Sequence, residues 1–180
     1  MTESDRLIDV LAGLPYDGYS AACVRGIGAA EAAQRLAAEP VGMDELAEIF
    51  EDVSADPALR IIGLSDVPGG CVVSQEWAYM AANPVVMQLL SAGTVAYGMF
   101  ANPKSGNQGR VFRDGALAAW DTDPGGNNVS GDDSAAEILL RYLYSGQALA
   151  YCYASATLRP TGTHSITNPD TYLRLPNRNY

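Results

Sequence analysis

The residues best suited to hold a metal ion lie between positions 121 and 133. Calcium takes several oxygen ligands from one flexible loop. Oxygen-bearing side chains stand at loop positions one, three, seven and twelve: Asp121, Asp123, Asn127 and Asp132. Position five, however, is Gly125, position twelve is not Glu, and a strand-like segment precedes the loop. We therefore expect a solvated loop rich in turn formers, with calcium affinity no tighter than about millimolar.

A second group of charged residues is acidic and could bind a basic partner. Residues 41–59 contain no basic side chain. The candidate partner-binding residues are Asp44, Glu45, Glu48, Glu51 and Asp52. Like charges four residues apart on a helix cost a few tenths of a kcal/mol per pair. Two interpretations stay open: a solvated helix face, or charge kept for a basic protein.

Signals for catalysis are poor, and no catalytic residue or cofactor is predicted. Cys23, Cys71 and Cys152 have apolar neighbours, which favours buried, reduced thiols. The only histidine, His164, lies in a polar stretch near the end of the chain. The chain lacks Gly-x-Ser-x-Gly, a phosphate-binding Gly-Lys-Ser/Thr loop and the dinucleotide-binding glycine pattern. A small carboxylate-based enzyme using Asp121 and Asp123 stays as an alternative.

Helices must position these groups, and their apolar periodicity predicts where they lie. Asn83 and Pro84 supply an N-cap and a first-turn proline. On the acidic helix we expect Leu46, Ile49, Phe50 and Val53 to face the core. Residues 147–157 fit either a helix or a strand, and their alanine content favours the helix. The helices are expected at residues 3–12, 29–38, 43–53, 84–91 and from 134 onward.

Short apolar runs between turn signals predict the strands. Pro68, Gly69 and Gly70 indicate a hairpin turn. The strands are expected at residues 19–25, 60–65, 71–75, 94–100, 110–113 and 117–120. We therefore predict a single α+β domain over residues 1–180, an antiparallel strand meander packed against several helices, with residues 160–180 an irregular C-terminal arm. Trp77 and Trp120 close two of the strands, and we expect both to be largely buried.

Several segments resemble a family of small actinobacterial proteins of unknown function. A Val-Arg-Gly helix start at 24–27 leads into 30–36, and Trp77 ends a strand. Further matching pieces lie at 90–102, 111–112, 114–115 and 120–124. The resemblance covers roughly residues 20–125. It implies an α+β fold with a strand meander and carries over no activity and no catalytic residue.

The charge balance narrows the classes of partner. The chain of 180 residues has 11 Lys and Arg against 21 Asp and Glu, a net charge of −10. Nucleic acid and anionic membranes should be repelled, and a basic protein attracted. The polar, acidic N-terminus and the arginine-rich, lysine-poor composition favour a cytoplasmic protein of actinobacterial or phage origin.

These features favour a non-catalytic binding protein that occludes a basic protein partner, such as an immunity or inhibitor protein. A tyrosine-rich C-terminal half and the absence of a catalytic constellation favour the same function. A structural or virion-associated role is the other alternative.

Overall fold

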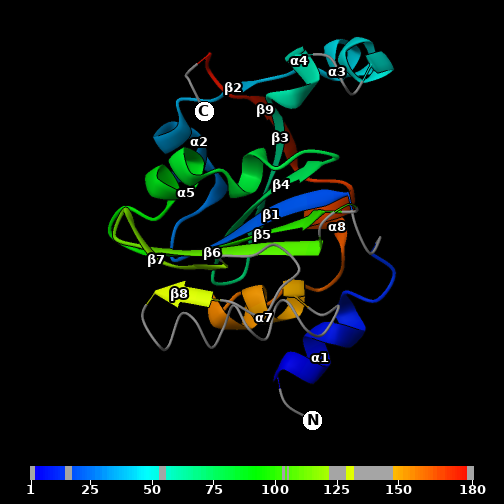
Figure 1. The fold of residues 1–180 in the computed structure, drawn as a ribbon. Helices are drawn as coiled ribbons and strands as arrows, with labels where there is room; N and C mark the ends of the chain where they lie inside the picture. Colours follow the sequence, from blue (N-terminus) through cyan, green and yellow to red (C-terminus); the bar gives the residue numbers. More distant parts are fainter. Residues whose placement is uncertain are drawn as a thin grey trace.

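The protein is an α+β structure in which helices lie on both faces of one antiparallel sheet (Figure 1). A computed structural model describes residues 3–14, 18–52, 56–102, 104, 106–121, 129–131 and 148–177. Within these ranges the strands are β1 (Tyr19–Arg25), β2 (Glu39–Pro40), β3 (Ile61–Val67), β4 (Gly70–Glu76), β5 (Val95–Asn102), β6 (Gly106–Arg113), β7 (Ala116–Asp121), β8 (Val129–Gly131) and β9 (Thr171–Arg174). Their order across the sheet is β2-β9-β3-β4-β1-β5-β6-β7-β8.

The described helices are short and divide between the two faces of the sheet. The α-helices are α1 (Glu3–Val10), α2 (Ala29–Leu36), α3 (Met43–Ile49), α4 (Asp56–Leu59), α5 (Pro84–Leu90), α7 (Ala148–Ser155) and α8 (His164–Thr167), and the 3-10 helices are η1 (Phe50–Asp52) and η2 (Met80–Ala82). In Figure 1, α2 and α5 lie above the sheet and α1 and α7 below it. None of the described helices is long and apolar enough to cross a membrane.

Strand β1 lies in the middle of the sheet and is buried on both faces. Tyr19, Ala21 and Cys23 pack in the core formed with α1 and α7. Ala22 and Val24 pack in the core formed with α2 and α5. Successive side chains of a strand point to opposite faces, so a strand covered on both sides is a continuous apolar run. This explains why the sequence of β1 does not alternate.

Local sequence signals are confirmed where they predicted caps and turns. The Asn83 side chain accepts a hydrogen bond from the amide of Val85 at 2.8 Å, at the start of α5. Strands β3 and β4 form the expected hairpin, with Gly69 at φ +104°. The ambiguous segment near residue 150 is helical, as α7. The helix expected from residue 134 lies outside the described residues.

The C-terminal segment corrects the expected irregular arm over residues 160–180. Strand β9 enters the sheet between β2 and β3, pairing Ile61 with Arg174 and Leu64 with Thr171. Leu173 of β9 and Leu175, just after the strand, are buried in the core on the α2 and α5 face. This segment is too short for its hydrophobic periodicity to predict a strand. Its pairing partners in β3 lie more than a hundred residues away in the chain. It becomes a strand because β3 offers unpaired backbone hydrogen-bonding groups along one side.

Candidate functional site

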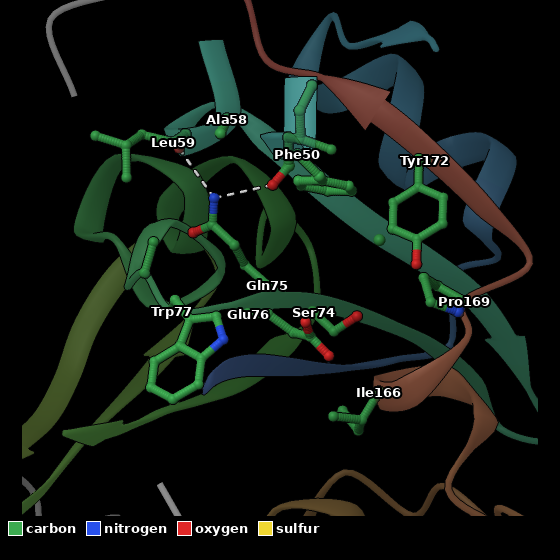
Figure 2. A pocket seen from close by; sticks show the side chains of 13 residues that line it. Phe50, Ala58, Leu59, Ser74, Gln75, Glu76, Trp77, Ile166, Pro169 and Tyr172 are labelled. Carbon is green, nitrogen blue, oxygen red and sulfur yellow. Dashed lines mark hydrogen bonds between the residues drawn. The ribbon is translucent and has the colours of Figure 1, made fainter. Parts of the chain in front are cut away.

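A pocket of about 220 Å³ opens where β3 and the end of β4 lie close to η1, α4 and α8 (Figure 2). Its lining comes from separate parts of the chain: Phe50, Ala58, Leu59, Ile61, Gly63, Ser74, Gln75, Glu76, Trp77, Ala78, Ile166, Pro169 and Tyr172. A side chain on Gly63 would collide with the ring of Pro169. Glycine at this position therefore lets the segment after α8 close one wall of the pocket.

The buried side chain of Gln75 holds the opposite wall. Its amide nitrogen donates to the carbonyl oxygens of Leu59 and Ile61, both at 2.9 Å. Its carbonyl oxygen accepts a hydrogen bond from the amide of Met80 at 2.8 Å. Both donors and the acceptor of the side-chain amide are thus engaged with the backbone. Gln75 fixes the shape of the pocket, and its polar atoms are not available as the main contacts of a ligand.

Trp77 is 63% exposed at the rim of the pocket, so the prediction that it is largely buried is wrong. Its backbone has φ +56°, which is rare for a bulky residue. The indole lies over Gly18, where an added Cβ would stand 2.7 Å from the ring, and the Trp77 amide donates to the Gly18 carbonyl. The turn after β4 therefore directs the indole along the surface and away from the core. Trp120, the other predicted core tryptophan, is only partly buried.

Phe50 corrects a second prediction, because it is 43% exposed and lines the pocket. Leu46 is buried and Ile49 partly buried, as expected for the apolar face of α3. The α-helix ends at Ile49, and the chain continues as the 3-10 helix η1. The tighter turn changes the direction of the next side chain, so Phe50 leaves the face that packs on the sheet. Its ring meets Tyr172 edge-on, with ring centroids 6.2 Å apart.

Among the described residues that line the pocket, Glu76 is the only charged one. It is exposed at the end of β4, and the Ser74 side chain projects from the same strand (Figure 2). Burial, and then the nearby Glu76 carboxylate, raise the pKa of the Tyr172 hydroxyl. Tyr172 therefore stays a neutral phenol, able to donate or accept a hydrogen bond. The pocket combines three aromatic rings, two hydroxyl groups and one carboxylate.

The acidic residues of α3 and η1 lie directly before and after Phe50. The side chains of Asp44, Glu45, Glu48 and Glu51 are exposed, as expected; that of Asp52 lies outside the described residues. The Glu45 carboxylate forms an ion pair with Arg174 of β9, with a nitrogen–oxygen distance of 2.7 Å. This pair links α3 to β9. The role of the other carboxylates in binding a partner stays a prediction.

The other candidate groups are not brought together with the pocket. Asp121 ends β7, whereas Asp123, Asn127 and Asp132 lie outside the described residues, and the calcium site stays a prediction. Across the described ranges, no group of three or more acidic, histidine or cysteine residues is placed to hold a metal ion.

The three cysteines are buried, as predicted. Burial raises the pKa of the Cys23 and Cys71 thiols, which keeps them protonated. A protonated thiol is a poor nucleophile, so burial works against a reactive role for these two residues. His164 is exposed at the start of α8 and does not line the pocket.

A second, open hollow contains Asp114, but its charged groups serve the fold. Asp114 accepts a hydrogen bond from the amide of Gly93 at 2.8 Å. Arg25, also in the lining, donates to the backbone carbonyls of Ser155 and Ala156. These contacts join the turn after β6 to the turn before β5, and the end of β1 to the end of α7. The carboxylate-based enzyme gains no support from this hollow and stays a prediction.

Comparisons of the chain with models of known protein families, with curated proteins and with solved structures find no match. The resemblance to the actinobacterial family stays a prediction, and function has to be argued from the pocket and the surface around it. Sequence reasoning missed the pocket. The one local signal was the succession Gln75-Glu76-Trp77, polar and aromatic residues where a buried strand ends.

Proposed function

We propose that this chain is a non-catalytic binding protein that occludes a basic protein partner. The partner would engage a surface that we call the acidic–aromatic surface, which consists of Asp44, Glu48, Glu51, Phe50, Glu76 and Trp77. The observation that carries the proposal is the exposure of Phe50 and Trp77 around one pocket next to an acidic helix. Aromatic residues are enriched in the cores of protein interfaces, and complementary charge speeds association.

Large apolar side chains around the pocket remain exposed after folding. Trp77, Phe50 and Leu59 keep 63%, 43% and 37% of their surface in contact with solvent, although all three line a concave site. Large apolar side chains clustered at a hollow mark binding surfaces more often than single exposed apolar residues do. The backbone of Trp77 adopts a conformation that costs on the order of 1–3 kcal/mol in a bulky residue. Strained backbone conformations cluster at functional sites, where the surrounding structure holds them in place.

The negative charge of the chain favours a basic partner. The chain carries −10, and the exposed carboxylates of α3 and η1 border Phe50. Opposite charge on the partner would accelerate encounter, and the same field would repel nucleic acid and acidic proteins. Immunity and inhibitor proteins directed against basic toxins work by such occlusion. This class fits the acidic–aromatic surface without requiring any catalytic group.

The proposal is tested by charge reversal on a partner captured by cross-linking in a bacterial or phage host and then purified. Glu48→Lys on α3 should slow association by about three- to tenfold at low salt, and the difference should shrink at high salt because exposed charges are screened. Asp9→Lys on α1 is the matched control, since Asp9 is also exposed on a short helix, and α1 and α3 lie at opposite ends of the molecule (Figure 1).

Surface plasmon resonance at two ionic strengths measures both variants. Equal association rates for Glu48→Lys and Asp9→Lys would contradict the proposed surface. An acidic partner would contradict the proposed function.

A further inference from the structure

We infer that the pocket between η1 and α8 receives the side chain of an arginine presented by the partner. This inference rests on the proposed function for the basic character of the partner, and it adds the chemical group that is recognised. Three features of the pocket carry it: its single charge, its aromatic rings and the positions of its free polar groups.

The negative charge of Glu76 favours a positively charged ligand in the pocket. In the part of the chain that the structure describes, Glu76 is the one charged residue that lines the pocket, and it lies at the end of β4. Arginine and lysine in the described part of the chain contribute nothing to the lining; the nearby Arg174 is held by Glu45. An anion brought into the pocket would meet Glu76 with no compensating positive charge. A cation would gain a partner there.

The rings favour a planar cation with an aliphatic stem. Phe50, Trp77 and Tyr172 surround the opening, and Figure 2 shows Trp77 on one side of the pocket and Tyr172 on the other. A guanidinium group stacks on aromatic faces and is more weakly hydrated than an ammonium group, so it loses less on leaving water. The cavity of about 220 Å³ is roughly seven times a water molecule's share of the liquid, which suits one long side chain.

The polar groups of the pocket match a donor-rich ligand. A guanidinium group carries five N–H donors and no acceptor. The Glu76 carboxylate can accept two of these in parallel, and the Ser74 and Tyr172 hydroxyl groups offer further acceptors from the wall. The side-chain amide of Gln75 makes all its hydrogen bonds to the backbone, so it is not a partner for the cation, and these bonds fix the orientation of Gln75.

The experiment follows the indole resonance of Trp77 by NMR during titration with short peptides. The probes are acetyl-Gly-Arg-Gly-amide, its lysine counterpart and its citrulline counterpart, in which the guanidinium is replaced by a neutral group of the same shape. Trp77→Phe assigns the resonance. We expect the arginine peptide to bind most tightly, the lysine peptide several-fold more weakly, and the citrulline peptide not to bind. Citrulline binding as tight as arginine would overturn the inference.

Variants locate the binding in the pocket. Glu76→Gln should weaken the arginine peptide at least tenfold, and circular dichroism checks that the variant stays folded. Asp9→Asn removes the same charge from an exposed position on α1 and should change the affinity less than twofold. Equal weakening by the two variants would show that only the net charge of the chain matters, and would contradict binding of arginine in the pocket. Tetramethylammonium binding more tightly than the arginine peptide would also overturn it, in favour of a free small cation.

The peptide titration tests the arginine pocket, and the association measurement tests the proposed function, so one can be contradicted without the other. An arginine peptide that shifts Trp77 and depends on Glu76 supports the pocket whatever Glu48→Lys does to association with the purified partner. A partner that associates more slowly with Glu48→Lys, while the peptide leaves Trp77 unchanged, supports the proposed function and overturns the arginine pocket.

Discussion

The buried amide of Gln75 ties three backbone groups together beside the pocket, and Gln75→Met removes all three hydrogen bonds while keeping the side chain long and flexible. The bond to the carbonyl of Ile61 is buried, so its loss leaves an acceptor without water. Such a loss costs about 1–3 kcal/mol. The bonds with Leu59 and Met80 are only partly buried, so water replaces them in part, and each is worth about 0.5–1.5 kcal/mol.

The free energy of unfolding should therefore fall by about 2–6 kcal/mol. In a chain of this size, 1 kcal/mol corresponds to roughly 2–4 °C in Tm, so a mid-range loss lowers Tm by roughly 10 °C. Urea denaturation at neutral pH, followed by far-ultraviolet circular dichroism, measures the change. Gln34→Met on α2 is the matched control because Gln34 is exposed, and it should stay within about 0.5 kcal/mol of the parent chain. A loss for Gln75→Met within about 1 kcal/mol of the control would refute the reasoning.

Three further predictions concern other parts of the chain. The Tyr153 hydroxyl lies 2.6 Å from the Ser165 hydroxyl in a buried contact between α7 and α8. Tyr153→Phe and Ser165→Ala should each lower the free energy of unfolding by about 1–3 kcal/mol, and the double variant by clearly less than both losses added; full additivity in urea denaturation would contradict the contact. Burial raises the pKa of the Cys71 thiol to about 12, whereas an unfolded thiol loses its proton near pH 9. The folded chain keeps a proton that the unfolded chain releases, so stability is complete below about pH 9 and falls as the pH rises above it; Cys71→Ala should flatten this fall by up to roughly 1.4 kcal/mol per pH unit, and equal slopes between about pH 9 and 11 would contradict the assignment. Isothermal titration should detect calcium binding no tighter than about millimolar, and micromolar affinity abolished by Asp121→Ala would overturn this expectation.

Local signals in the sequence determined several elements by themselves. Asn83 and Pro84 define the start of α5 because a side-chain cap and a fixed φ need only neighbouring residues. The continuous apolar run of β1 and the Gly69 turn depend in the same way on short-range order. The exposure of Glu48 and the burial of Leu46 also follow from helical periodicity alone. Helix caps, apolar runs and turn residues of this kind predict the α+β class without any tertiary contact.

The pocket depends on contacts between distant segments of the chain. Phe50, Trp77 and Tyr172 line the same pocket although they lie on three separate segments of the chain, and the pairing of β9 with β3 brings Tyr172 there across more than a hundred residues. Hydrophobicity predicted Trp77 and Phe50 to be buried. Their exposure depends instead on a positive φ at Trp77, supported by Gly18, and on the change from α3 to the 3-10 turn η1. Composition and periodicity report how apolar a residue is, whereas the direction of its side chain is set by backbone geometry and by segments distant in sequence.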